Sequence, residues 1–317
     1  MSTLSNNLNK AEHLEIVYSL LVPVYNAEAY IAAFLEEIKL LRKPFDEIIF
    51  YDDASTDATA SLLASSGFHV ILGKINKGPG YARNRLAEAA QGKYIHFHDV
   101  DDRFNPLFLN LLDQPLKNQS YDVILGNSDW LDSNTNNAIL RWRYSIDAIN
   151  KDPLKYFIQH PLGIINTIYK RAKFISTGGF DEQLKCWEDA DLHVKLASQH
   201  ATFAYIDEVL AYSIRHNNGI SNNQIACWGC RLKFLALYLA KFESRLYREV
   251  IKEEVIKVKN NFLILGAYKE LKKIAAVNKE YDLNINLTKS ICFYYADNII
   301  PHFILVKLFR LLSSNKI

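Results

Sequence analysis

The sequence predicts an α/β fold, a mostly parallel sheet with helices on both faces, followed by a helical C-terminal region. In the first half, short apolar runs alternate with stretches whose apolar residues recur at helical spacing. This alternation is typical of parallel sheets, because parallel strands need crossover helices. Beyond Asn222 the strand-like runs stop, and no proline occurs before Pro301. The composition of the 317 residues, 49% hydrophobic and 23% charged, is that of a globular protein.

The predicted strands are short runs rich in β-branched, aromatic and leucine residues. Pro23 follows the first run, and we expect it to end that strand. The next stretch places Ile31, Phe34 and Ile38 on one helix face. Residues 55–57 provide N-cap chemistry for the second helix. The strands are expected at residues 16–22, 47–51, 69–72, 93–98 and 121–125, and further helices at 27–41, at 79–91 and from 187.

The change of pattern predicts a domain boundary between residues 222 and 230, which divides the chain into residues 1–225 and 226–317. From Arg231 onward the chain has 16 Lys and Arg against 8 Asp and Glu, whereas the rest has 21 against 27. We expect this basic region either to contact a membrane surface through residues 299–312, or to pack on the first domain or form a homo-oligomer. A solvated helix surface would have the same charge. The expected helices are 226–241, 246–268 and 269–279.

The sequence argues against secretion, membrane spanning and nucleic-acid binding. No apolar run reaches about 18 residues, and the first ten residues lack the pattern of a signal peptide. The formal net charge is only +2, and four cysteines are too few for a disulfide scaffold. Cys227 and Cys230 lie one turn apart in a predicted helix and are interpreted as packing residues. The predicted location is the cytoplasm, or the inner face of the cytoplasmic membrane.

Three polar clusters follow predicted strands at their carboxyl ends, at residues 23–26, 52–53 and 99–102. The carboxyl ends of parallel strands meet at one edge of the sheet, and open α/β sheets bind ligands in the crevice beyond that edge. The sequence therefore predicts a site built from these three clusters.

The third cluster contains two carboxylates one residue apart, Asp99 and Asp101. Placed together in a crevice they repel each other, and a divalent cation would relieve that repulsion. Oxygen ligands suit a hard ion such as Mg²⁺ or Mn²⁺, which leaves coordination positions open for phosphate oxygens. The alternative is an acidic loop that caps the helix near Asn105.

Two other positions have two interpretations each. Asp53, next to Asp52, could orient a nucleotide base or ribose, or lie in a solvated turn. A phosphoacceptor of the response-regulator kind is disfavoured, because here the acidic pair follows the second strand. Arg83, in the first turns of a helix after Gly78, could meet a diphosphate or be a surface arginine. Its segment matches neither the dinucleotide fingerprint nor the phosphate-binding P-loop.

Two more candidates lie further along the chain. Asp189, beside Glu188, opens a predicted helix, where an acidic residue is favoured by the helix dipole alone. The functional alternative is a general base acting on a hydroxyl group. His216 lies in a predicted loop, where it could bind a metal or a diphosphate, or be solvated.

Taken in order, these residues resemble glycosyltransferase family 2, whose members have the GT-A fold and include inverting transferases. The resemblance covers residues 15–221 and leaves out the basic tail. The ordered set is specific although each motif is weak. It consists of Pro23, Tyr25 and Asn26, then Asp52, Asp53, Ser55 and Asp57, then Asn76, Gly78 and Ala82–Asn84, then Asp99, Asp101 and Asp102, then Gly178–Asp181, and finally Glu188 and Asp189.

The resemblance implies a role for each candidate. Pro23, Tyr25 and Asp53 would hold the nucleotide base, Arg83 would lie near the diphosphate, and Asp99 would point toward the ribose. Asp101 and His216 would bind Mn²⁺ or Mg²⁺, and Asp189 would be the catalytic base. Two features depart from the family pattern. The segment between Asp57 and Asn76 is compact, and His96 and His98 precede the acidic cluster where apolar residues are commoner; neither histidine is assigned a catalytic role.

The implied activity is that of a hexosyltransferase that moves a sugar from a nucleotide-sugar, by expectation a UDP-sugar, to a saccharide or lipid-linked saccharide. Members of this family commonly act in bacterial surface polysaccharide or lipopolysaccharide biosynthesis, and the resemblance suggests the same role here. Two alternatives stay open: a non-catalytic nucleotide-sugar binder and a haloacid-dehalogenase-like phosphatase. The phosphatase motif has Thr or Val at the position that Arg103 occupies here, and it usually lies at the start of its domain.

Overall fold

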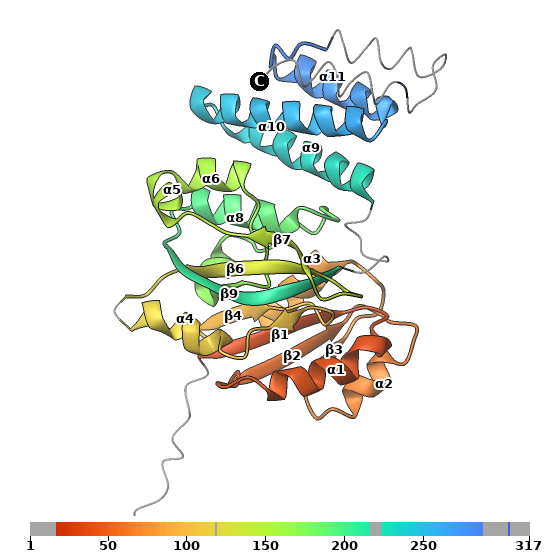
Figure 1. The fold of residues 1–317 in the computed structure, drawn as a ribbon, viewed down its shortest axis with the longest axis vertical. Helices are drawn as coiled ribbons and strands as arrows, with labels where there is room; N and C mark the ends of the chain where they lie inside the picture. Colours follow the sequence, from red (N-terminus) through yellow and green to blue (C-terminus); the bar gives the residue numbers. More distant parts are fainter. Residues whose placement is uncertain (1–16, 118, 216–222, 288–303, 305–317) are drawn as a thin grey trace, which may run out of the picture.

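The structure, a computed structural model, describes residues 17–117, 119–215, 223–287 and Ile304. Within these residues nine strands form one mixed, mostly parallel sheet with helices on both faces (Figure 1). The predicted fold class is therefore confirmed. The strand order is β3-β2-β1-β4-β8-β6-β9-β5, and β7 pairs with β6 outside this path.

The strands are β1 (Tyr18–Val24), β2 (Glu47–Asp52), β3 (His69–Leu72), β4 (Tyr94–Phe97), β5 (Arg103–Phe104), β6 (Val123–Asp132), β7 (Ala138–Trp142), β8 (Thr167–Lys170) and β9 (Phe203–Arg215). The helices are α1 (Glu28–Lys39), α2 (Thr59–Ala64), α3 (Pro79–Ala89), α4 (Phe108–Leu116), α5 (Ile146–Lys151), α6 (Pro153–Gln159), α7 (Arg171–Ser176), α8 (Glu188–Ser198), α9 (Gln224–Lys241), α10 (Arg245–Ile264) and α11 (Leu271–Glu280). A short 3₁₀ helix, η2 (Tyr268–Glu270), lies between α10 and α11.

The functional edge of the sheet follows from its topology. β3, β2, β1 and β4 are parallel, and β6 is parallel to β9. β4 and β6 are both antiparallel to β8, so these six strands all point the same way. The carboxyl ends of β1, β2 and β4, at Val24, Asp52 and Phe97, therefore lie at one edge, which we call the carboxyl edge.

Pro23 does not end the first strand, and that prediction is wrong. β1 continues to Val24, and Pro23 is paired in register with Tyr51 of β2. The His98 amide donates to the Leu21 carbonyl on the β4 side of β1, and the Asp53 amide donates to the Val24 carbonyl on the β2 side. Successive residues of β1 therefore bond to opposite neighbouring strands. Pro23 faces the β4 side, where strand pairing already ends at Leu21, so its missing N–H breaks no ladder bond.

Two helix boundaries also differ from the prediction. α2 begins at Thr59 with Ala58 as its N-cap, although Asp57 still accepts a bond from the Thr59 amide at 3.0 Å. The predicted helix over residues 246–268 ends as α10 at Ile264, because Gly266 adopts a φ of +67°. A glycine in the left-handed conformation directly after a helix is a common stop signal.

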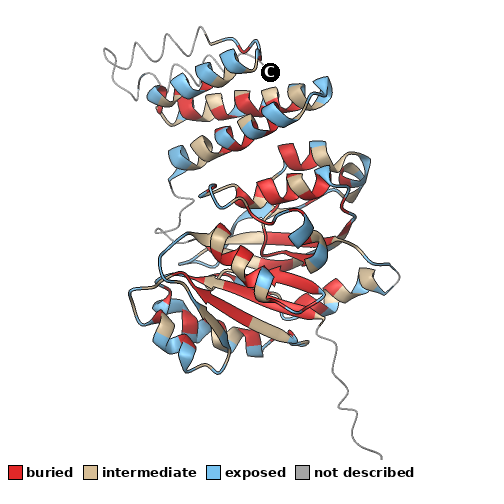
Figure 2. Cartoon of the chain, turned by 180° about the vertical axis from the view of Figure 1, so that it is seen from behind, coloured by how far each residue is buried: buried red, intermediate tan, exposed pale blue. Residues whose placement is uncertain are grey.

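Two hydrophobic clusters cover the two faces of the sheet. Leu20 belongs to the cluster that packs under α1 and α4, whereas its neighbour Leu21 belongs to the cluster under α3 and α8. The cluster that contains Leu21 also includes buried residues of α9, α10 and α11. Figure 2 shows buried positions on these C-terminal helices. The domain boundary near residue 225 stays a prediction.

The C-terminal helices are fixed to the body through polar contacts as well. Tyr238 of α9 donates to the Asp191 carboxylate of α8 at 2.8 Å. Arg231 of α9 pairs with Glu254 of α10 at 3.1 Å and bonds the Ile158 carbonyl of α6. In Figure 1, α6 and α8 lie between the sheet and these helices. Within the part of the chain that is described, no helix is both long and apolar enough to cross a membrane; of the predicted surface segment 299–312, only Ile304 is described.

Candidate active site

The loop after β4 concentrates negative charge at the carboxyl edge. Asp102 is buried, and its carboxylate accepts a bond from the Ile214 amide of β9 at 2.9 Å. Burial raises the pKa of Asp102 well above its ordinary value, and the nearby charges of Asp99 and Asp101 raise it further. A cation bound at this loop would relieve the repulsion.

Arg83 of α3 joins this loop to a distant part of the chain. Its Nη2 donates to Asp99 at 2.8 Å, and its Nη1 donates to Glu188 of α8 at 2.9 Å. The arginine is only 5% exposed, and its guanidinium lies over the Phe180 ring. In this structure Arg83 thus holds two carboxylates in place; its role at a diphosphate stays a prediction.

Three acidic side chains lie in the first turn of α8, and their partners differ. Glu188 is bound by the arginine described above, and Asp191 accepts a bond from Tyr238. Asp189 accepts a bond from the Ala190 amide at 2.7 Å. Among the described residues no side chain bonds the Asp189 carboxylate, and Asp189 is partly exposed whereas Glu188 and Asp191 are buried. Of the three acids in this turn, Asp189 is therefore the one most open to a ligand.

The environment of Asp189 adjusts its acidity. Burial raises the pKa of its carboxyl group to about 7, and the charge of Glu188 acts in the same direction. The Ala190 amide and the Arg83 charge oppose this rise. A carboxylate with a pKa near neutrality is suited to take a proton and release it again.

The turn that presents Asp189 is held from α9. Trp187 has a left-handed φ of +70°, and its Nε1 donates to the Cys227 carbonyl at 2.8 Å. The Arg231 guanidinium lies 4.5 Å from the centre of the Trp187 ring. Arg231 was not among the residues predicted for the site. The signal for it in the sequence is a charged residue among the apolar positions of α9, next to Leu232 and Leu235.

The residues expected at the nucleotide base lie at the ends of β1 and β2. Tyr25 is 49% exposed at the carboxyl edge, directly after Pro23 and Val24. Asp53 is buried, and its carboxylate accepts bonds from the Lys77 and Gly78 amides at 2.7 to 3.1 Å. Asp53 therefore shapes the turn that leads into α3, and contact with a base stays a prediction.

The two histidines before the acidic loop are packed in the core. Nδ1 of His96 lies 2.8 Å from the Thr167 carbonyl oxygen, and Nε2 of His96 lies 3.1 Å from Nδ1 of His98. His98 stacks on Phe104 with ring centres 3.6 Å apart. Burial lowers the pKa of His98 to about 3, so it is neutral at physiological pH. These contacts give both histidines a structural role.

The acidic loop fits a hard divalent cation of the kind that keeps most positions for substrate and water. Among the described residues, no three His, Cys, Asp or Glu side chains are arranged to hold a metal ion. Mg²⁺ is usually held by one or two carboxylates together with phosphate oxygens, so a complete protein cage is not required. Asp101 would supply an oxygen ligand, and the other predicted ligand, His216, lies outside the described residues.

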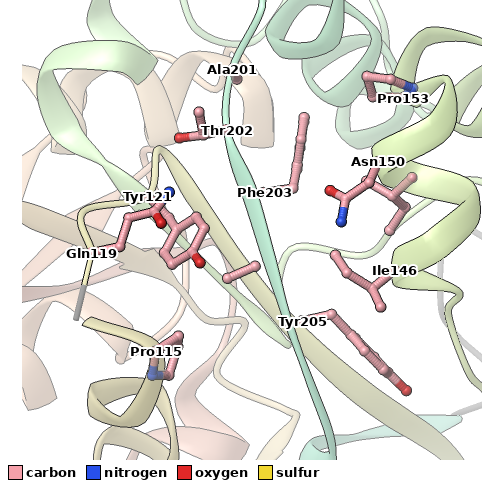
Figure 3. Close-up of a pocket in the computed structure, with 12 residues that line it drawn as sticks. Pro115, Gln119, Tyr121, Ile146, Asn150, Pro153, Ala201, Thr202, Phe203 and Tyr205 are labelled. Atoms are coloured by element: carbon pink, nitrogen blue, oxygen red, sulfur yellow. The ribbon is translucent and has the colours of Figure 1, made fainter. Parts of the chain in front are cut away.

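A cavity of about 540 Å³ lies at the opposite edge of the sheet (Figure 3). Tyr121, Thr202 and Phe203, which precede or open β6 and β9, line it together with residues of α5. None of the described residues that line this cavity is an Asp, Glu, Lys or Arg. The cavity therefore lies apart from the residues of the carboxyl edge.

The similarities of this chain to known proteins agree with the family that its sequence motifs resemble. The sequence profile named Glycosyl transferase family 2 matches residues 19–179, about half of the chain. A 91-residue segment, 27% of this chain, is 36% identical to TuaG of Bacillus subtilis (strain 168), whose name refers to teichuronic acid biosynthesis. That segment spans 36% of the length of TuaG.

Several solved structures share the fold, among them those of TarS and PcManGT. S. aureus TarS 1-349 in complex with UDP-GlcNAc has a TM-score of 0.56 at 20% identity, covering 75% of this chain and 71% of that one. The mannosyltransferase PcManGT from Pyrobaculum calidifontis, in complex with GDP-Man and Mn²⁺, has a TM-score of 0.57 at 15% identity. That match covers 93% of this chain and 84% of the other.

Proposed function

This chain belongs to glycosyltransferase family 2, and we propose that it transfers a sugar from a UDP-sugar to a hydroxyl group of a saccharide or lipid-linked saccharide. The observation that carries the proposal is the convergence of Arg83, Asp99 and the Glu188–Asp189 pair at the carboxyl edge. The name of TuaG supports a product of the surface-polysaccharide kind. The UDP-GlcNAc bound to TarS supports a UDP-sugar as donor.

In the proposed reaction, Asp189 takes the proton from the acceptor hydroxyl while that oxygen attacks the anomeric carbon. The nucleoside diphosphate leaves from the opposite face, so a single displacement inverts the configuration. Arg83 keeps Asp99 and Glu188 in fixed positions during the reaction. Asp101 and His216 would hold Mn²⁺ or Mg²⁺, and the bound ion would supply Lewis-acid chemistry for the charge on the departing diphosphate.

The binding part of this proposal predicts metal-dependent affinity for UDP. Calorimetric titration should show UDP binding in the presence of Mn²⁺ and much weaker binding without it. Loss of an outer-shell partner alone costs about 10–100-fold in metal affinity, so the Asp101→Ala variant should lose at least about tenfold in UDP affinity. Asp147→Ala, an exposed first-turn acid of α5, is the matched control and should bind as the wild type does.

The results of this titration distinguish a wrong donor nucleotide from a wrong proposed function. If UDP does not bind with either metal, GDP and dTDP are titrated next, and binding of one of them would replace UDP in the proposal. Failure of all three would contradict the proposed function. Equal UDP affinity of Asp101→Ala and wild type would contradict the metal assignment.

The catalytic part predicts a pH dependence. A general base works only when deprotonated, so kcat/KM should rise with pH and level off above about 7, the pKa of Asp189. The neighbouring Tyr144 and Tyr169 have raised pKa values and stay neutral over this range. A profile that is flat down to pH 5, set against the ordinary value of 3.8, would contradict the raised pKa of Asp189.

A peripheral membrane contact through residues 299–312 is the proposed use of the basic C-terminal region, with dimer formation as the alternative. Deletion of residues 289–317 should then shift the protein from the membrane fraction to the supernatant after centrifugation. An unchanged distribution, with an unchanged mass in solution, would contradict both uses of this segment.

A further inference from the structure

The start of α8 is held from two sides, and Asp189 lies between the held positions. The Trp187 indole donates a hydrogen bond to a carbonyl of α9. The Glu188 carboxylate is paired with an arginine of α3, and the Asp191 carboxylate accepts a bond from a tyrosine of α9. Two of these three contacts therefore come from α9, which belongs to the C-terminal helices.

Trp187 has a backbone conformation that is unfavourable for a large residue. Its φ of +70° and ψ of 12° lie in the left-handed region, at the point where the chain turns into α8. Glycine adopts these angles readily, whereas a residue with a bulky side chain does so only where the surrounding structure fixes it. The contacts of the Trp187 side chain are therefore expected to offset the cost of this conformation.

Three contacts hold the Trp187 indole against α9. Its Nε1 donates to the Cys227 carbonyl at 2.8 Å. The guanidinium of Arg231 lies over the ring, 4.5 Å from its centre, and a cation at the face of an indole is an attractive contact. The ring of Trp228 packs against it with the centres 6.2 Å apart.

The arginine in this anchor is itself fixed. Arg231 is only 1% exposed. Its Nη2 pairs with Glu254 of α10 at 3.1 Å and also donates to the Ile158 carbonyl of α6. The guanidinium is thus held between helices on several sides, and it provides a firm surface on which the Trp187 ring rests.

We propose that Trp187 is a positioning residue for sugar transfer, whose indole, held by α9, fixes the turn that presents Asp189. The proposal rests on the proposed function, in which Asp189 is the base. The role belongs to the side chain, because glycine would serve the backbone conformation better. It follows that α9 is needed for catalysis, in addition to any contact that the C-terminal region makes with a membrane or a second copy.

The decisive variant is Trp187→Gly, which accepts the left-handed backbone and removes every contact of the indole. The measurement is the release of UDP from UDP-GlcNAc, with water in place of the sugar acceptor. A misplacement of about 1 Å at a reacting group can cost about 10²-fold in rate, so kcat should fall at least about tenfold. UDP affinity, measured by titration, should stay close to that of the wild type, because the proposed nucleotide contacts lie on other elements.

Hydrogen exchange of backbone amides tests the same turn without any substrate. The Asp191 amide donates to the Trp187 carbonyl at 3.0 Å, which closes the first turn of α8. This amide should exchange faster in Trp187→Gly than in the wild type, because local opening of the turn becomes easier. The amides of α1, on the other face of the sheet, should keep their wild-type rates.

A conservative variant and a matched control complete the test. Trp187→Phe keeps a ring beneath the arginine and loses only the N–H donor, so its kcat should lie between those of Trp187→Gly and the wild type. It also carries the comparison if Trp187→Gly does not fold. Trp142→Phe is the control, because the buried Nε1 of Trp142 has no hydrogen-bond partner among the described residues. This control should keep the wild-type kcat.

Four results would overturn the proposal. Wild-type kcat in Trp187→Gly would mean that the backbone alone positions Asp189, and a parallel loss of UDP affinity would mean general disruption of the site. Unchanged exchange at the Asp191 amide would mean that the indole does not hold the turn. Equal kcat of Trp187→Phe and the wild type would exclude the bond to Cys227 as an anchor.

Failure of the proposed function gives a different result. In that case the wild type neither binds UDP nor releases it from UDP-GlcNAc. The exchange rates of the Asp191 amide in the wild type and in Trp187→Gly still decide whether Trp187 fixes the turn.

Discussion

Replacing Asp189 with asparagine is expected to lower kcat by about 10²–10⁴ and to leave UDP affinity close to that of the wild type. Asparagine has the same shape and can still accept the bond from the Ala190 amide. It cannot take a proton from the acceptor hydroxyl. The rate constant for transfer, measured with saturating donor, and the UDP affinity, measured by titration, separate these two effects.

The same variant distinguishes a catalytic base from a helix cap. If Asp189 only capped α8, Asp189→Asn would retain the bond to the Ala190 amide and most of the activity. Asp147→Asn removes an exposed first-turn carboxylate from α5 and controls for the general loss of a charge at a helix start. Activity above about a tenth of the wild-type rate in Asp189→Asn would contradict the assignment of the base.

The sequence predicted those elements whose signal is local. β3 was predicted at the residues where it lies, because a short apolar run lies between two glycines, Gly67 and Gly73. β8 was not predicted, although it lies between β4 and β6 in the sheet. Its four residues, Thr167–Lys170, are too few to show a period, and their pairing is set by strands far away in the sequence.

The candidate site was predictable as a set of strand ends but not as a network. The polar clusters after β1, β2 and β4 meet at one edge because the strands are parallel. The bond from Arg83 to Glu188, 105 residues away, depends on how α3 and α8 pack, which no local pattern shows.

That network predicts a large effect at Arg83. In Arg83→Met, the apolar side chain fills similar volume but leaves Asp99 and Glu188 without their cation. Breaking a buried ion pair by removing one partner costs about 3–5 kcal/mol, although Asp99 is partly exposed and water will reduce its share. Denaturant unfolding should show this loss, and transfer activity should fall below detection because the Glu188–Asp189 turn loses its anchor.

Arg85→Met is the matched control, two residues along α3. Its pair with Glu88 is exposed, so its free energy of unfolding should change by no more than about 1 kcal/mol. The double variant Arg83→Met/Glu188→Gln removes the less exposed of the two orphaned carboxylates together with the arginine. If unpaired charge causes the loss, the double variant should be more stable than Arg83→Met alone, since removing both partners avoids leaving a buried charge uncompensated. Additive losses in the double variant would instead mean that packing of the Arg83 side chain, and not its pairing, stabilises this part of the site.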